Sequence, residues 1–200
     1  MIKIINCNKK NYLNNLTKFL DLRRSGKKSE NKIISKILND IKNNKNKSLL
    51  KYEKKFSKNS QIKPSIKQIN KSIKSLDPKI KRAIDFAYKR ILKFHSLQKT
   101  TDIFYKDNLN NKIEYKYLPI QSVGIYVPAN LPSTLLMNAI PAKIAGVKRI
   151  VLANPKNNGK LNPAVLYAAK KLGINEIYSM GGAQAIGSLA YIQKVNKIVG

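Results

Sequence analysis

Two stretches of the sequence carry residue types that could bind a ligand, and each follows an apolar run typical of a strand. Gly181 and Gly182 lie between such a run and a helical pattern, so backbone N–H groups at a helix N-terminus could hold a phosphate or another anion. Gln184, in the first turn of that helix, carries an amide that both donates and accepts hydrogen bonds. Tyr126 ends the other run, where its ring could pack on a planar cofactor. We therefore take Tyr126 and Gln184 as candidate ligand-binding residues.

Each candidate also has a purely structural interpretation that the spacing leaves open. A Gly pair after a strand is also an ordinary tight turn, and the fuller GxGxxG fingerprint of dinucleotide sites is absent. Gln184 could be a solvated residue of a first helical turn, and Tyr126 could be an aromatic residue of the core. The residue types alone support a ligand-binding unit of the α/β class and no more.

The 200 residues contain no constellation for catalysis or for a metal. The chain has one histidine, His95, and one cysteine, Cys7, and it has no Ser-His-Asp set, paired His and carboxylate, or Cys/His cluster. His95 lies beside the apolar stripe of a predicted helix, and we interpret it as a packed or capping residue. We therefore assign no catalytic residue and no metal ligand.

Both candidates belong to a regular alternation of strands and helices. Apolar, β-branched runs predict strands at residues 122–127, 149–153, 176–180 and 197–199, with helical patterns between them. Ser133 and Asn162 are expected to cap the first two helices, and Pro141 to kink or restart the first. This alternation predicts a parallel α/β sheet, whose ligands bind beyond the carboxyl ends of the strands. We therefore expect Tyr126 and Gln184 at one rim of the sheet.

Residues 1–120 predict a helical region that ends in a β-hairpin and belongs to the first α/β domain. Ser29, Ser65 and Asp77 are expected to begin helices, with a break around Gly26. At residues 103–120 the spacing of the apolar residues changes from helical towards every second position. This alternation predicts a hairpin that leads into the sheet with half-buried tyrosines. Its aromatic and basic residues could instead stack on single-stranded nucleic acid. We place a boundary after residue 120, before a parallel α/β ligand-binding unit at 121–200.

The charge of the chain is extreme. There are 40 Lys or Arg against 10 Asp or Glu, a formal net charge of +30, so nucleic-acid binding through the Lys-rich N-terminal region is the alternative function. Against it, the lysines are spread through the helical patterns beside abundant Asn and Ile, which is what AT-rich coding produces. A single cysteine suits a reducing compartment, and no run is long enough to span a membrane. We expect a cytoplasmic protein with no membrane or nucleic-acid partner.

The motifs of the second half, with FHSLQ before them, form a set. In order they are SVGIYVP, LLMNAIPAKIAGVKRIVL, NPAVLYAAKKLG, EIYSMGGAQAIGSLAY and KVNKIVG. Together they resemble the N-terminal part of histidinol dehydrogenases, closely from residue 121 onward and loosely before residue 77. The resemblance implies NAD-dependent oxidation of L-histidinol to L-histidine by way of L-histidinal, the last step of histidine biosynthesis.

The resemblance also implies a fold and a site. It implies an incomplete Rossmann-like parallel sheet of the aldehyde-dehydrogenase-like kind, a homodimer and a zinc ion. Tyr126 in GIYVP and Gln184 in GGAQAI match family positions that contact NAD. The zinc ligands and a Glu-His acid–base pair are expected beyond residue 200, so we expect a fragment that is inactive by itself. A natural chain end at Gly200 and a non-catalytic relative that keeps only the sheet are the open alternatives.

Two loops near the candidate site are shorter than is usual in that family. The loop after Tyr126 is the short ANLPS, with Ala129 where Gly is usual, and the connection after Tyr191 lacks an insertion. We expect both changes to leave the sheet topology intact and to act on the details of NAD contact.

Overall fold

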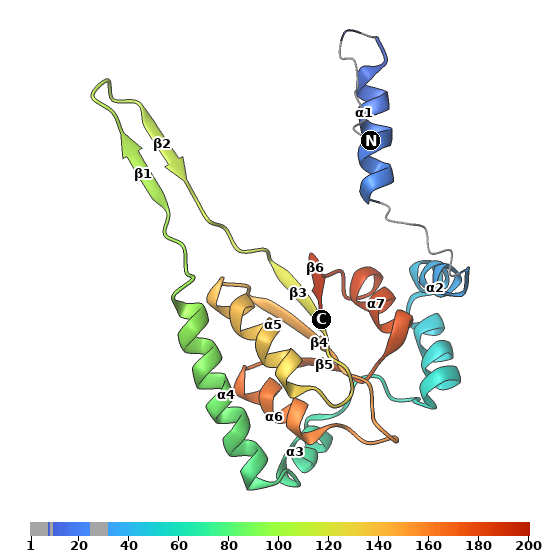
Figure 1. Cartoon of the computed structure of the whole chain (residues 1–200). Coiled ribbons are helices and arrows are strands. Elements are labelled where there is room, and N and C mark those ends of the chain that lie inside the picture. The colour runs from blue at the N-terminus through green and yellow to red at the C-terminus, as the bar shows by residue number, and fades with distance from the viewer. Residues whose placement is uncertain (1–7, 9, 25–31) are drawn as a thin grey trace, which may run out of the picture. The chain divides into compact units, whose positions relative to one another are not determined.

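The computed structural model describes residue 8 and residues 10–24 and 32–200, which form two compact units, residues 1–35 and 36–200. The first unit contains helix α1 (Tyr12–Arg24), which confirms the helix predicted there. Cys7, the break around Gly26 and the expected cap at Ser29 lie outside the described residues. The second unit holds the sheet and both candidate residues, and the candidate site is therefore built from it alone (Figure 1).

Helix α2 (Lys32–Ser57) bends at Lys45, whose backbone leaves the helical region with φ 47° and ψ −126°. Beyond the bend, Leu49, Tyr52 and Glu53 are buried on one side of the helix. Because these positions are three and four residues apart, they share a helical face. A buried carboxylate on that face is unusual and needs hydrogen-bond partners.

Helices α3 (Ile66–Lys74) and α4 (Pro78–Ser96) begin where the sequence predicts. Ser65 and Gln68 form a reciprocal capping box, which satisfies two N–H groups that the first turn of α3 leaves without helical partners. Asp77 lies directly before Pro78, and its side chain accepts a hydrogen bond from the N–H of Lys79. The caps at Ser65 and Asp77 are therefore confirmed.

Four parallel strands make the central sheet, as predicted. They are β3 (Ser122–Tyr126), β4 (Arg149–Ala153), β5 (Glu176–Tyr178) and β6 (Lys197–Val199), in the spatial order β5-β4-β3-β6. All residues of β3 except Tyr126 are buried, as are all residues of β4 except Arg149. Continuous burial is expected of a parallel sheet that is covered on both faces.

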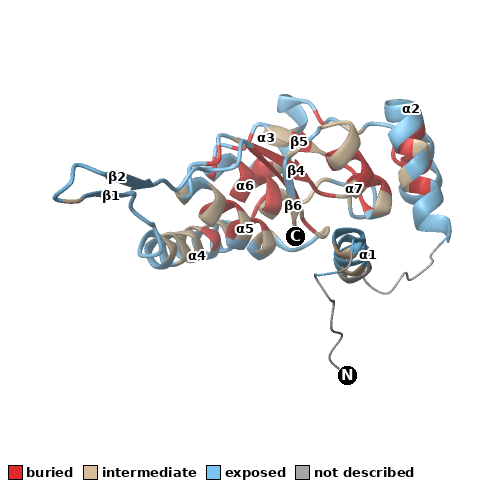
Figure 2. Ribbon diagram, turned by 90° about the horizontal axis from the view of Figure 1, so that it is seen from above, coloured by how far each residue is buried: buried red, intermediate tan, exposed pale blue. Residues whose placement is uncertain are grey.

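Helices cover the two faces of the sheet (Figure 2). On one face, α5 (Pro132–Ile144) and α6 (Pro163–Lys171) pack with α3 and α4 over Ile125 and Leu152. On the other, α7 (Gly182–Tyr191) packs over Val151 and Ala153, and Leu49 of α2 joins the same apolar cluster. The strand residues alternate between two cores because successive side chains point to opposite faces.

The connection from α7 to β6 is fixed at the amino edge of the sheet. The Arg149 guanidinium donates two hydrogen bonds of 2.7 Å to the Glu176 carboxylate and one of 2.8 Å to the carbonyl of Gln193. This arrangement joins the first residues of β4 and β5 to the short loop after Tyr191. The shortened loop therefore has a defined anchor outside the candidate site.

The β-hairpin forms, but it does not join the main sheet. Strands β1 (Ile103–Lys106) and β2 (Lys112–Tyr115) pair antiparallel as a separate two-stranded sheet, which extends away from the helices in Figure 1. Every residue of both strands is exposed. The expectation of half-buried tyrosines was therefore wrong, because no described element covers either face of the hairpin.

Two expectations for α5 were also wrong, namely the cap at Ser133 and a restart at Pro141. The helix begins at Pro132 with Leu131 as its N-cap and no side-chain cap, so Ser133 lies inside the first turn. Proline at the first helical position already removes one N–H that a cap would have to satisfy. The helix does not restart at Pro141, which lies in its last turn, where only one internal hydrogen bond is lost. By contrast, Asn162 caps α6 as predicted, accepting from the N–H groups of Ala164 and Val165.

We predict that Asp85 makes the stability of the second unit depend on pH. The Lys171 ammonium, 2.8 Å away, and the Tyr167 hydroxyl both donate to Asp85 and hold its pKa below the usual value. A depressed carboxylate pKa stabilises the fold above the unfolded-state value of about 4, and the stabilisation is lost as the pH falls through the folded-state pKa. The free energy of unfolding should therefore fall more steeply in acid for the wild type than for Asp85→Asn.

Urea unfolding followed by circular dichroism from neutral to acid pH measures this difference. Glu114→Gln is the control, because its ion pair with Lys116 has both side chains about half exposed, at 49% and 51%. Equal acid slopes for wild type and Asp85→Asn would show that the Asp85 cluster does not link α4 to α6 energetically.

Candidate functional site

The strand order creates a switch point beside Tyr126. Counted along the chain, the four strands lie in the order 3-2-1-4, so β3 has the next strand on one side and the last strand on the other. Helices that follow such neighbours leave in opposite directions, and ligands of open α/β sheets bind in the crevice between them. Tyr126 is the last residue of β3 and lies at this crevice.

Tyr126 lies next to the turn that leads into α7. Its hydroxyl oxygen accepts a hydrogen bond from the N–H of Gly182, at 3.4 Å. Tyr126 packs with the apolar cluster on the α7 side of the sheet, so Tyr126 and the residues that open α7 share one face. The expected meeting of the two loops at one rim is confirmed, whereas the contact of either residue with a ligand stays a prediction.

The backbone favours glycine at position 182. Its φ of +60° is one that other residues rarely adopt, and an added Cβ would come within 3.0 Å of Gln184 Oε1. Gly182 is exposed, while the amide of Gln184 lies directly beneath it. The absence of a side chain at 182 therefore leaves the space beside the Gln184 amide oxygen free of a Cβ.

Gln184 is not the solvated residue that remained open from the sequence. It is 3% exposed, and its Nε2 donates to Oε1 of Glu53 at 2.9 Å. The same Glu53 oxygen accepts the N–H of Gly181, also at 2.9 Å. Sequence reasoning missed Glu53, although an acid four residues after Leu49 on an apolar helical face was the available signal.

The turn between β5 and α7 is also held by the segment after α2. The Asn59 side chain, which is 4% exposed, donates to the carbonyl of Ser179 at 2.6 Å. The N–H of Ser179 donates to the carbonyl of Ile62, and Lys156 donates to Asn59 Oδ1 at 2.9 Å. Residues far apart in the sequence thus fix the backbone that presents Gly181 and Gly182.

Asn154 fixes the loop on the other side of the crevice. Its buried Nδ2 donates to the carbonyls of Val127 and Pro128, at 3.0 and 3.2 Å. Its backbone N–H donates to the carbonyl of Tyr178, at 2.9 Å. The residue after β4 therefore shapes the start of the loop after Tyr126, a role that the sequence did not indicate.

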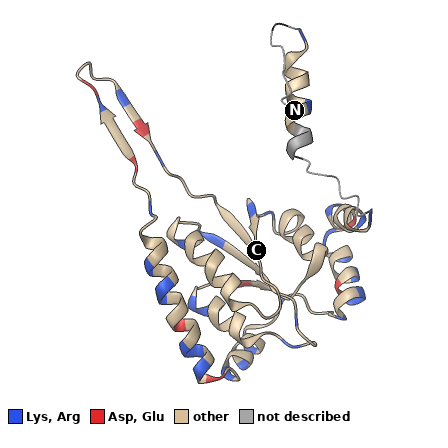
Figure 3. Ribbon diagram, in the orientation of Figure 1, with Lys and Arg blue, Asp and Glu red and all other residues tan. Residues whose placement is uncertain are grey.

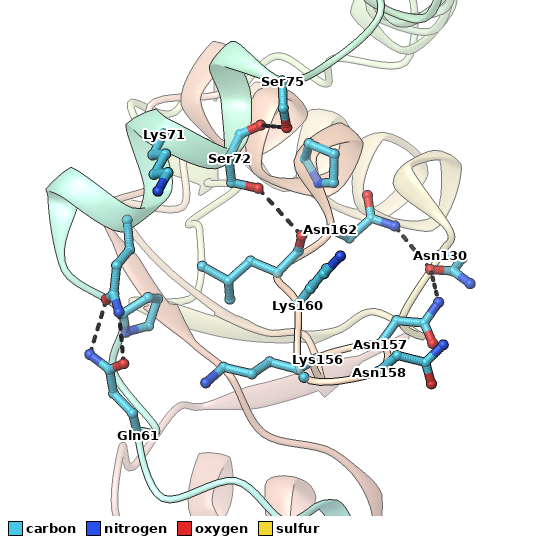
Figure 4. Close-up of a pocket in the computed structure, with 15 residues that line it drawn as sticks. Gln61, Lys71, Ser72, Ser75, Asn130, Lys156, Asn157, Asn158, Lys160 and Asn162 are labelled. Atoms are coloured by element: carbon cyan, nitrogen blue, oxygen red, sulfur yellow. Dashed lines mark hydrogen bonds between the residues drawn. The ribbon is translucent and has the colours of Figure 1, made fainter.

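A cavity of about 1050 Å³ lies between α3 and the loops that follow β3 and β4 (Figure 4). Asn130 Oδ1 accepts from the side chains of Asn157 and Asn162, and Lys71 and Lys160 also line the space. Three of its 15 lining residues are lysines, close to the share of Lys in the whole chain, so the cavity is not enriched in positive charge. We assign no ligand to it.

Groups for acid–base or metal chemistry are sparse. Among the described residues, no three His, Cys, Asp or Glu side chains come together as a metal site. His95, in the last turn of α4, shares a hydrogen bond of 2.6 Å with Gln98 and lies apart from the crevice residues. None of the helices in the described ranges is long and apolar enough to cross a membrane.

Comparison with known protein families identifies the family of this chain. The family model described as histidinol dehydrogenase matches residues 22–200. The chain belongs to the histidinol dehydrogenase family. A histidinol dehydrogenase of Pelagibacter ubique (strain HTCC1062) is 56% identical over 100% of this chain and 48% of its own length. One of Idiomarina loihiensis is 42% identical over 79% of this chain and 37% of its own.

A solved structure agrees with the sequence relatives. The crystal structure of histidinol dehydrogenase from Elizabethkingia anophelis matches with a TM-score of 0.78 and 38% identity, covering 84% of this chain and 41% of that one. The chain spans about half the length of the curated relatives it matches.

We predict that Asn154→Leu destabilises the chain. The change leaves the carbonyls of Val127 and Pro128 without their buried donor, which should lower the free energy of unfolding by about 1–3 kcal/mol. Urea unfolding measures it. Asn175→Leu, at an exposed position, is the matched control and should change stability by less than about 0.5 kcal/mol. Equal midpoints for both variants would contradict a role of Asn154 in holding the loop.

Proposed function

We propose that the whole protein oxidises L-histidinol to L-histidine by way of L-histidinal, with NAD accepting a hydride in each of two steps. Family membership supports this activity, and histidine biosynthesis in the cytoplasm is the pathway that it implies. Within that protein, the present chain supplies one rim of the NAD site. The observation that carries the assignment is the contact of Tyr126 with Gly182 at the switch point of the sheet.

The strand order supports a dinucleotide as the ligand. The order 3-2-1-4 equals the first four strands of the Rossmann order 3-2-1-4-5-6. We propose that the sheet is an incomplete Rossmann-like unit of the aldehyde-dehydrogenase-like kind. Its crevice lies where such units hold nicotinamide dinucleotides, and Tyr126 and Gln184 are the residues of this chain that we assign to NAD.

The residues at the rim fit a dinucleotide. Tyr126 offers a half-buried ring and a hydroxyl that can still donate its proton, and Gln184 offers its amide oxygen beside the exposed Gly182. Bound NAD would supply the hydride acceptor of the reaction. The chain's own residues would bind and orient it.

A zinc ion is part of the proposal for the whole protein. The described residues offer no group of ligands that fits it, so we derive no step through zinc from this chain. We expect its ligands, and the Glu-His pair that would move protons, outside these 200 residues.

The hairpin supports the proposal that the whole protein is a homodimer. Its exposed side chains include Phe104 at 66%, Ile113 at 62% and Tyr115 at 57% exposure. Apolar side chains gathered on an uncovered element are typical of protein–protein contacts. A second copy of the chain is the partner that the family suggests.

Nucleic-acid binding receives less support. Lysines and arginines are distributed over α2, α3, α4 and the hairpin and do not gather on one element (Figure 3). The matched relatives are named as dehydrogenases. The enzyme is therefore the function that we propose.

We predict that Tyr126→Ala and Gln184→Ala each weaken NAD binding by the chain at least about tenfold. Each change removes a group that we place against the cofactor. NAD is titrated into the 15N-labelled chain, and the dissociation constant is taken from shifts of the Gly181 and Gly182 amides. Tyr105→Ala, at an exposed tyrosine of the hairpin, should bind like the wild type. Unchanged affinity in both site variants would remove the assignment.

We also predict that the chain alone does not turn over substrate. With L-histidinol and NAD, no formation of NADH above the blank is expected at 340 nm, because the described residues provide no acid–base pair or metal site. The complete Pelagibacter ubique relative serves as the positive control. NADH formation by these residues without any added portion would overturn this division of roles.

A further inference from the structure

Glu53 is a buried acid that the proposed function does not yet use. It is 1% exposed, and within the described ranges it forms no ion pair. An ionised carboxylate in such a place is costly unless donors surround it. Its position therefore needs an explanation beyond the packing of α2.

Both donors to Glu53 belong to the start of α7. The N–H of Gly181 and Nε2 of Gln184 each lie 2.9 Å from Oε1 of Glu53, across 128 and 131 residues of sequence. Gly181 is the N-cap of α7 and has no side chain with which to cap it. Oε1 of Glu53 takes the place of that cap by accepting the N–H of Gly181.

The Glu53 side chain determines how the Gln184 amide is turned. Its Oε1 accepts the hydrogen bond from Gln184 Nε2, so the amide oxygen points away from Glu53. The amide oxygen then lies nearer to the exposed Gly182: a Cβ built there would be 3.0 Å from Oε1 and 3.6 Å from Nε2. The group beneath Gly182 is therefore an acceptor.

We propose that Glu53 is a positioning residue that holds Gln184 with its amide oxygen towards Gly182, so that NAD is met there by a hydrogen-bond acceptor. The matching group of the cofactor is a donor, either a ribose hydroxyl or the carboxamide NH2, and not a phosphate oxygen. This inference rests on the proposed function, in which Gln184 contacts NAD. It adds a residue of α2 to a site otherwise built from β3 and α7.

A double-mutant cycle on NAD affinity tests the inference. Glu53→Met keeps the length of the side chain and removes the acceptor, so the Gln184 amide is free to turn, and NAD should bind about tenfold more weakly. Gln184→Ala should weaken binding at least as much. Because Glu53 acts through Gln184, the double variant should bind no more weakly than Gln184→Ala alone. Asp40→Asn is the matched control, since this acid of α2 bonds to Asn44 and Ser48 of its own helix.

The outcomes separate the two levels of the proposal. If Gln184→Ala binds NAD like the wild type, the proposed function of Gln184 fails, whatever Glu53 does. If Gln184→Ala is weakened while Glu53→Met binds like the wild type, the role of Glu53 fails and the proposed function stands. If the two effects add in the double variant, Glu53 acts by another route and the inference is overturned.

An exchange of the two side chains decides the matter if Glu53→Met does not fold. In Glu53→Gln/Gln184→Glu, the new amide at 53 donates to the new carboxylate at 184, which still presents an oxygen to Gly182. NAD should then bind within about threefold of the wild type. Glu53→Met/Gln184→Met keeps the packing without any acceptor and should bind at least about tenfold more weakly. An exchanged chain that fails to fold, or that binds as weakly as the Met pair, overturns the inference.

Discussion

The parallel pairing of β3 with β4 on one side and with β6 on the other is the constraint on which the candidate site depends. Because β3 lies between its immediate successor and the last strand, α5 and α6 cover one face of the sheet and α7 covers the other. The two layers diverge at the carboxyl ends, and Tyr126 lies in the gap between them. The pairing of the strands therefore determines where the crevice lies.

The surface of the crevice is shaped by buried polar side chains that bond to loop backbone. Asn154 holds the loop after β3, Asn59 holds the end of β5, and Glu53 holds the first residues of α7. Buried polar groups are expensive unless they are paired, and here their partners are the N–H and C=O groups that irregular loops would otherwise leave unsatisfied. The same bonds that satisfy the loops also make the rim a preformed surface.

The local geometry is compatible with the role that we propose for this chain. Tyr126, which we propose to contact NAD, lies beside the turn that opens α7, and the described residues offer no cluster for a metal. Our proposal therefore assigns binding and chemistry to different parts of the polypeptide. Such a division is common where a Rossmann-like unit holds the cofactor and another segment completes the reacting centre.

The sequence by itself determined the elements whose signals are local. The strands at 149–153 and 197–199, the caps at Ser65 and Asn162, and the parallel order followed from periodicity, capping residues and alternation, because each depends on neighbours a few residues away. Only the tertiary structure decided that Gln184 is buried, that Glu53 and Asn154 hold the rim, and that the hairpin tyrosines are exposed. Those features depend on contacts between residues up to 131 positions apart, or on the absence of a covering element, and periodicity carries no information about either.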